Sequence, residues 1–168
     1  MNPLPAFEDE LSALLPRLRR FAHGLSRSPA DADDLTQMTV ERALRSKAQW
    51  QPGTRLDSWL YKIMRNLWID TMRVRGRQGK VEAPAEEAEA LGHDPRAGIE
   101  AAIDLKRVMA AMDRLPGEQR EVVALILIEG FGYREAAELL GLPIGTVSSR
   151  LVRGRTALLA MVASEDDD

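Results

Sequence analysis

The residues with the clearest chemical purpose lie near the C-terminus, between Tyr133 and Arg155. Their pattern predicts two short helices joined by a tight turn, in which Gly141 ends the first helix and Pro143 blocks its continuation. Gly145-Thr146 is expected to open the second helix, with Thr146 as its N-terminal cap. No acidic residue occurs from Leu139 to Ser164, whereas three arginines do: Arg150, Arg153 and Arg155. This pattern is typical of a helix-turn-helix whose second helix enters the DNA major groove.

A second helix could contact single-stranded nucleic acid. It is expected to begin with Asp57 or Ser58 as its cap and to run to about Arg75. Polar, charged and aromatic side chains fall on one face of it at spacings of three and four: Trp59, Lys62, Asn66, Asp70 and Arg73. Rings stack on bases, amides read base edges and cations hold phosphates. An ordinary solvated helix face is the alternative. Whether Trp50, Trp59 and Trp68 belong to the core or to a contact surface stays open at this point.

Composition excludes several classes of protein. The chain of 168 residues has no cysteine, which rules out disulfides, thiolate catalysis and cysteine–zinc sites. Its two histidines are far apart, no run is long enough to span a membrane, and no signal pattern begins the chain, so a cytoplasmic protein without membrane insertion is expected.

The net charge of −3 is unusual for a DNA-binding protein, but the charge is segregated. The basic run 73–80 precedes the acidic stretch 82–104, which is either a solvated linker or a segment that tunes binding.

Apolar residues recur at three and four along the chain, so we expect an all-α fold. An apolar stripe runs from Phe7 to Leu25, and Pro16 should bend or restart that helix. Ser28 is expected to cap a helix that runs to about Arg45. A very apolar helix over 118–129 should form the core of the C-terminal part. We therefore expect two small helical domains, a helical bundle and a helix-turn-helix domain. Their expected bounds are 1–76 and 97–163, with a flexible acidic linker at 77–96 and an acidic tail at 164–168.

Three blocks of sequence together resemble the bacterial RNA polymerase sigma factors of the extracytoplasmic-function (ECF) group, in the sigma-70 family. Residues 32–44 are similar to the helix that docks on the polymerase. Residues 50–66 are similar to the loop and helix that read the −10 element. Residues 115–155 are similar to the domain that reads the −35 element. The resemblance implies that the two domains are sigma regions 2 and 4.

The resemblance also implies roles for individual residues. Docking on the clamp helices of the polymerase β′ subunit would involve Asp34, Leu35, Gln37, Met38 and Arg42. The −10 loop that holds a flipped base would comprise Gln51, Pro52, Gly53, Thr54, Arg55 and Leu56. The −10 strand would also contact Trp59, Lys62, Arg65, Asn66, Asp70 and Arg73. The −35 duplex would meet Thr146, Ser148, Ser149, Arg150, Val152 and Arg153.

Three positions depart from the family pattern. Met38 stands where an acidic residue is usual, which removes one docking salt bridge. Ser148 stands where a basic residue is common, so the −35 preference is expected to differ. Gly154 replaces a usual alanine and should cost about 1 kcal/mol of helix stability.

The function implied is that of an alternative sigma factor. Its partners would be promoter DNA, an anti-sigma factor and core RNA polymerase, which it would contact at the β′ clamp and the β flap. No catalytic residue, metal or cofactor is expected. One alternative is a sigma-like mimic that binds regulators without reading promoters. A simple helix-turn-helix repressor leaves the docking block unexplained. An enzyme is disfavoured because no nucleophile–base pair and no phosphate-binding glycine loop occurs.

Overall fold

The computed structural model describes residues 6–78 and 99–164, and these are helical apart from short turns and loops. It separates into two compact units, 1–86 and 87–168. The first unit contains α1 (Phe7–Ser26), α2 (Pro29–Arg45), the 3₁₀ turn η1 (Lys47–Gln49) and α3 (Leu56–Arg77). The second contains α4 (Ile99–Arg114), α5 (Gly117–Val123), the π-helical turn η2 (Ala124–Ile128), α6 (Tyr133–Leu140) and α7 (Ile144–Ser164). The predicted all-α class is confirmed.

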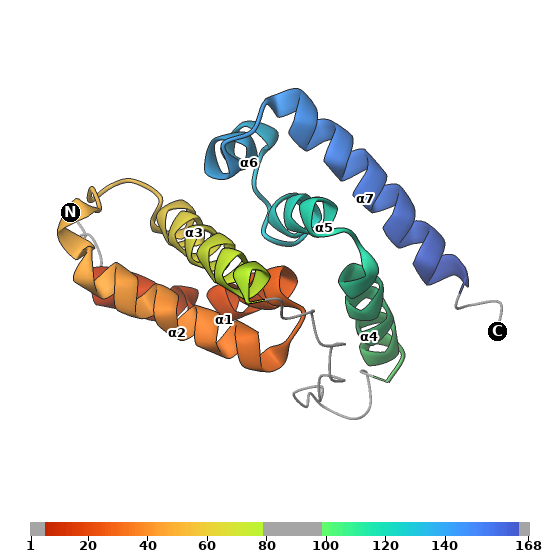
Figure 1. The fold of residues 1–168 in the computed structure, drawn as a ribbon, viewed down its shortest axis with the longest axis horizontal. Coiled ribbons are helices and arrows are strands. Elements are labelled where there is room, and N and C mark those ends of the chain that lie inside the picture. Colours follow the sequence, from red (N-terminus) through yellow and green to blue (C-terminus); the bar gives the residue numbers. More distant parts are fainter. Residues whose placement is uncertain (1–5, 79–98, 165–168) are drawn as a thin grey trace. The chain divides into compact units, whose positions relative to one another are not determined.

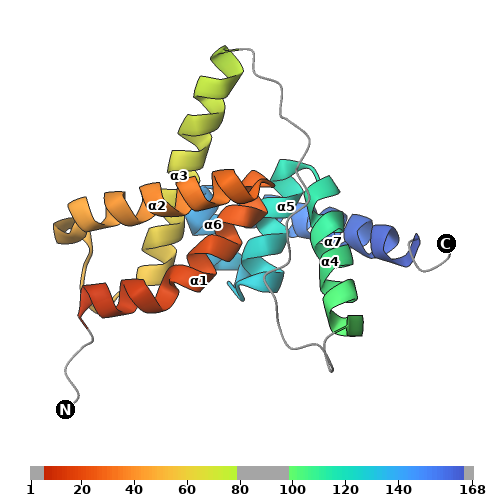
Figure 2. The ribbon, with the colours of Figure 1, turned by 90° about the horizontal axis from the view of Figure 1, so that it is seen from below.

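In the first unit, α1 and α2 pack side by side, α3 crosses both, and the last turns of α3 extend beyond the pair (Figure 1, Figure 2). The predicted start of α2 is confirmed, since the Ser28 hydroxyl accepts a hydrogen bond from the Asp31 amide at 3.4 Å. The ring of Phe21 lies 4.6 Å from that of Tyr61, a fully buried residue of α3. All three helices contribute apolar side chains to the core of this unit: Phe7, Leu11, Leu18, Phe21, Leu25, Leu35, Leu56, Leu60 and Met64.

Two local predictions in this unit need correction. Pro16 does not restart the first helix, because α1 is continuous from Phe7 to Ser26, and the alternative of a bend at Pro16 stays a prediction. Neither Asp57 nor Ser58 caps α3, which begins two residues earlier than Ser58, at Leu56, after Arg55. The predicted linker 77–96 and tail 164–168 lie outside the described residues, except that Arg77 and Gln78 end α3 and Ser164 ends α7.

In the second unit, α4, α5 and α6 all contact the long helix α7 (Figure 1). The expected apolar helix ends in a π turn, in which the Glu129 amide donates to the Ala124 carbonyl at 2.9 Å. The turn from α4 to α5 is held by the buried Arg120, whose Nη1 donates to the Leu115 carbonyl at 3.2 Å. Gly141 has φ of 64°, which confirms the predicted left-handed end of α6.

Gly154 marks the closest approach of α5 and α7. A Cβ atom at this position would lie 2.7 Å from Cγ2 of Val123 and 3.3 Å from Cβ of Gln119. The glycine therefore lets the two helices pack closer than an alanine would, which offsets the cost in helix propensity that the sequence predicts.

We predict that Gly154→Ala destabilises the packing of α5 on α7. Overpacking costs about 1–3 kcal/mol, whereas the better helix propensity of alanine returns about 1 kcal/mol. Amide hydrogen exchange in α5 and α7 should therefore be several-fold faster than in the wild type. Gly145→Ala is the matched control, because a Cβ at Gly145 of the same helix meets nothing within 4 Å. Slower exchange in Gly154→Ala would contradict the packing argument.

Candidate nucleic-acid interface

A small hollow of about 160 Å³ lies between α2 and α3. It is far smaller than the roughly 300–1,000 Å³ of a cofactor pocket. Eight residues line it: Arg42, Ser46, Gln49, Trp59, Ile63, Asn66, Leu67 and Asp70. Trp59, Asn66 and Asp70 are thus brought together as predicted for the −10 strand, and Arg42, which was predicted for docking, joins them. Ile63 and Leu67 add the apolar part of the lining, and both are half-buried.

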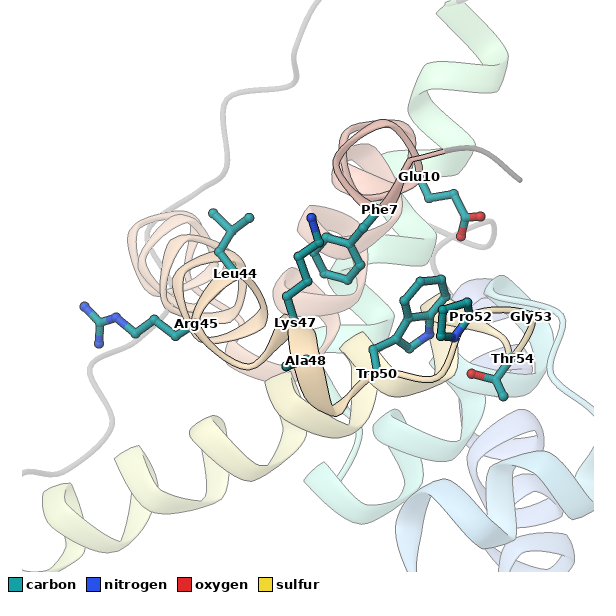
Figure 3. Close-up of a pocket in the computed structure, with 10 residues that line it drawn as sticks. All are labelled: Phe7, Glu10, Leu44, Arg45, Lys47, Ala48, Trp50, Pro52, Gly53 and Thr54. Atoms are coloured by element: carbon teal, nitrogen blue, oxygen red, sulfur yellow. The ribbon is translucent and has the colours of Figure 1, made fainter. Parts of the chain in front are cut away.

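A second, larger pocket of about 940 Å³ lies at the N-terminus of α1 and the C-terminus of α2 (Figure 3). The predicted −10 loop lines this pocket through Pro52, Gly53 and Thr54, and it does not line the small hollow. The other lining residues come from α1, the end of α2 and η1: Phe7, Glu10, Leu44, Arg45, Lys47, Ala48 and Trp50. Three of the predicted −10 residues therefore line this pocket, three others line the small hollow, and the rest line neither cavity.

The tryptophans combine packing with partial exposure. The ring of Phe7 lies 5.5 Å from that of Trp50 and 6.2 Å from that of Trp59, and both indoles are half-buried. Trp68 lies under the guanidinium of Arg75, at 5.7 Å. Trp50 and Trp59 each line a cavity while packing against the core, so neither of the two alternatives that the sequence left open describes them completely.

The loop before α3 has a defined conformation. Both the amide and the hydroxyl of Thr54 donate to the Gln51 carbonyl, at 3.2 and 2.7 Å. Gly53 has φ of 87°, a left-handed conformation that favours glycine. The side chain of Leu56 is only 3% exposed, so it anchors the loop in the core and cannot itself contact DNA.

Asp57 positions the loop before α3, a role that the sequence did not predict for it. Its carboxylate, 8% exposed, accepts hydrogen bonds from Arg55 at 3.1 and 2.8 Å and from Arg17 of α1 at 3.3 Å. The amide of Ser58 donates to it at 2.8 Å. Burial raises the pKa of Asp57, but these hydrogen bonds and the two arginine charges outweigh burial and leave the pKa below its ordinary value. Asp57 thereby fixes Arg55 at the base of the loop.

The predicted docking residues of α2 differ in accessibility. Asp34, Gln37, Met38 and Arg42 are exposed, and the Gln37 amide donates to Glu41 at 3.4 Å. Leu35 is 2% exposed and belongs to the core, so its side chain cannot touch a partner while the unit is folded. The prediction of direct contact through Leu35 is therefore withdrawn.

The basic end of α3 contains both structural and exposed arginines. Arg75 donates two hydrogen bonds to Asp31 at the start of α2, at 2.8 and 2.6 Å. The Arg75 hydrogen bond holds the pKa of Asp31 below its ordinary value despite partial burial. Arg73 is exposed and lies 3.7 Å from Asp70. Of the other cations predicted for the strand, Lys62 is exposed and Arg65 is half-buried.

Helix α7 has one buried face and one exposed face. Val147, Leu151 and Gly154 face the core. Because 3.6 residues complete a turn, Ser149, Val152 and Arg153 lie on the opposite side, and all three are exposed. Thr146 does not cap the helix as predicted, because α7 begins at Ile144, and the Pro143 carbonyl accepts from the Thr146 and Val147 amides. Ser148 is half-buried on the flank of the helix.

Arg150 occupies the other flank of α7 and has a partner within the unit. Its Nη2 lies 3.3 Å from a carboxylate oxygen of Glu118 on α5, and its side chain is 23% exposed. Arg153 is exposed and forms no ion pair within the part of the chain that the structure describes. The two arginines that look equivalent in the sequence therefore have different surroundings.

Within residues 6–78 and 99–164, no three His, Cys, Asp or Glu side chains are grouped so that they could hold a metal ion. None of the described helices is both long enough and apolar enough to cross a membrane.

Comparison with known proteins gives two family matches, one for each unit. Residues 11–78 match sigma-70 region 2. Residues 105–158 match sigma-70 region 4.

Relatives and solved structures cover most of the chain. The sequence is 38% identical to the ECF RNA polymerase sigma factor EcfG of Rhodopseudomonas palustris, over 94% of this chain and 85% of the relative. It is also 38% identical to SigE of Mycolicibacterium smegmatis, over 98% of this chain and 65% of the relative. The sigma factor RpoE of Bartonella quintana, solved with the anti-sigma factor NepR, is 34% identical, with a TM-score of 0.79 over 94% of this chain and 96% of that one.

The chain therefore belongs to the sigma-70 family of RNA polymerase sigma factors, within its ECF group. Its function is that of an alternative sigma factor, which binds core RNA polymerase and promoter DNA to direct transcription initiation.

We predict that Asp57→Asn lowers the free energy of unfolding of the first unit by about 1.5–3 kcal/mol at pH 7, the range for hydrogen bonds to a charged group. Because the folded pKa of Asp57 is depressed, this contribution is present above the unfolded pKa and is lost as the pH falls through the folded value. The difference between wild type and variant should thus begin to shrink below about pH 4 and vanish once the pH is below the folded pKa of Asp57.

Urea unfolding followed by tryptophan fluorescence measures this effect, because Trp50, Trp59 and Trp68 all lie in the first unit. The control is Asp33→Asn, which removes an exposed carboxylate of α2. A difference for Asp57→Asn that persists at pH 2 would show that the charge of Asp57 is not responsible.

Proposed function

We propose that the small hollow between α2 and α3 receives one unstacked base of the −10 element and so stabilises the melted promoter. One observation carries the proposal: the hollow gathers an amide, a carboxylate, a guanidinium and an indole, from Asn66, Asp70, Arg42 and Trp59, in a volume of about 160 Å³. This volume suits a single base rather than a whole cofactor.

The chemistry of the lining supports a base as the occupant. The Asn66 amide and the Asp70 carboxylate together offer donors and acceptors for the edge of a base, and Trp59 offers part of a ring face. The exposed cations Lys62 and Arg73, on the same helix, are suited to the phosphates that flank that base. Extruding a base costs a few kcal/mol, which stacking and hydrogen bonds in the hollow can offset.

The larger pocket is the second candidate for the base. The resemblance assigns the flipped base to the loop, and Pro52, Gly53 and Thr54 line this pocket. One observation favours it: within the described residues, the buried indole N–H of Trp50 beside this pocket has no hydrogen-bond acceptor.

For polymerase docking we propose the exposed side of α2, formed by Asp34, Gln37 and Met38, with Arg42 between this side and the hollow. The β′ clamp is the proposed surface for α2, and the β flap is the proposed surface for the second unit. The domain bounds are proposed as 1–76 for region 2 and 97–163 for region 4.

For the −35 duplex we propose that Ser149, Val152 and Arg153 face the major groove, with Thr146 and Ser148 beside them. Arg150 supports the same surface from the flank through its pair with Glu118. Since RpoE of Bartonella quintana was solved with the anti-sigma factor NepR, we also propose that this chain is controlled by an anti-sigma protein. It acts without catalysis of its own, in the cytoplasm, where the polymerase works.

We predict that Asn66→Ala impairs promoter melting while leaving polymerase binding intact. Permanganate footprinting of thymines in the melted region, with purified chain and core polymerase, measures open-complex formation. A single lost base contact should reduce melting several-fold to about a hundredfold, as expected for 1–3 kcal/mol. Gln37→Ala should show the opposite pattern, with weaker binding to core polymerase and normal melting once polymerase is saturated.

The matched control for Asn66→Ala is Gln78→Ala, which removes an exposed amide from the end of the same helix, outside the hollow. If Asn66→Ala melts normally whereas Thr54→Ala does not, the base belongs in the larger pocket. If the wild-type chain with core polymerase initiates at no promoter, the mimic that binds only regulators is the better account.

A further inference from the structure

We infer that Val152 reads the 5-methyl group of a thymine in the −35 element. The inference rests on the proposed function of α7 and deepens it by assigning a chemical group to one side chain. Val152 is 62% exposed, although it sits in the middle of a helix that has a well-packed buried face.

The position of Val152 directs it away from the protein. It lies on the side of α7 opposite Val147, Leu151 and Gly154, and the close contact of Gly154 with Val123 fixes the rotation of the helix against α5. A valine side chain in a helix has one strongly preferred χ1 rotamer. Its two methyl groups are therefore held in a defined direction, as a selective apolar contact requires.

The groups around Val152 favour DNA over an apolar protein partner. Ser149 and Arg153 on the same face are polar or charged, and no acidic residue occurs between Leu139 and Ser164. The exposed Leu159 lies about two turns further along the same side of α7. Apolar side chains separated in this way do not form the contiguous patch that marks a protein interface. In the major groove, the C5-methyl of thymine is the apolar group on the edge of an A·T base pair, and aliphatic side chains contact it.

Ser149 and Arg153 supply the polar contacts that complete the surface. The Ser149 hydroxyl donates to the Thr146 carbonyl at 3.1 Å and keeps its lone pairs for a base donor or a water. Arg153 is suited to a phosphate or a guanine. Val152 then distinguishes thymidine from deoxyuridine, which neither polar side chain can do, because the two nucleosides present the same hydrogen-bonding groups.

Deoxyuridine tests the inference, because it differs from thymidine only by the methyl group. With holoenzyme assembled from the full chain and core polymerase, each thymine on either strand of the preferred −35 sequence is replaced in turn. We expect one replacement to weaken binding about fourfold, which corresponds to the loss of one buried methyl-sized group. Val152→Ala should bind thymidine and deoxyuridine equally at that position.

The matched control is Leu159→Ala, since Leu159 is 59% exposed on the same helix, and this variant should retain the fourfold preference. Amide exchange in α7 should be unchanged in both variants. The inference is overturned if no −35 thymine shows a deoxyuridine effect in a holoenzyme that initiates normally, or if Val152→Ala keeps the preference. Failure to initiate at any promoter would overturn the proposed function itself.

Discussion

The close packing of α5 on α7 at Gly154 is the constraint on which the DNA-facing surface depends. With no Cβ at this position, Val123 and Gln119 of α5 approach the backbone of α7 directly. This contact fixes the rotation of α7 and decides which residues are buried and which are exposed. Ser149, Val152 and Arg153 face outward as a consequence, and Arg150 is left on the flank beside Glu118. The surface proposed to read DNA is thus specified by a contact on the opposite side of the helix.

The first unit uses charged side chains in a similar way, to hold elements that carry functional residues. Asp57 links the loop arginine Arg55 to Arg17 of α1, and Asp31 links Arg75 of α3 to the start of α2. These arginines serve the fold, whereas Lys62 and Arg73 are exposed, as their proposed contact with phosphates requires. The net charge of −3 is compatible with DNA binding because α3 carries five cations against two acids, and α7 carries three arginines and no acid.

Local patterns in the sequence predicted the elements well, because the physics of those elements is local. The Ser28 cap of α2, the left-handed Gly141 and the all-α class depend on residues within a turn of one another. The caps predicted at Asp57 or Ser58 and at Thr146 failed, although caps are local. The other misses depend on contacts between distant residues. Leu35 lies on a helix face whose partner cannot be seen in the sequence, and the pairing of Arg75 with Asp31 on α2 joins positions 44 residues apart. Asp57 was a candidate cap in the sequence. Its buried carboxylate instead accepts four hydrogen bonds: one from Arg17 of α1, two from Arg55 and one from the Ser58 amide. The sequence also could not separate Arg150 from Arg153, because Glu118 lies on a different helix.

The salt dependence of −35 binding tests most directly whether helix packing assigns these two arginines different roles. Holoenzymes with Arg150→Ala or Arg153→Ala would be titrated with promoter DNA over a range of salt concentrations. Because Arg153 is exposed, its loss should reduce the slope of log affinity against log salt by about one. Because Arg150 is already paired with Glu118, its loss should weaken binding with little change in slope. An equal reduction of the slope in both variants would contradict the account, since it would mean that Arg150 contacts a phosphate as Arg153 does.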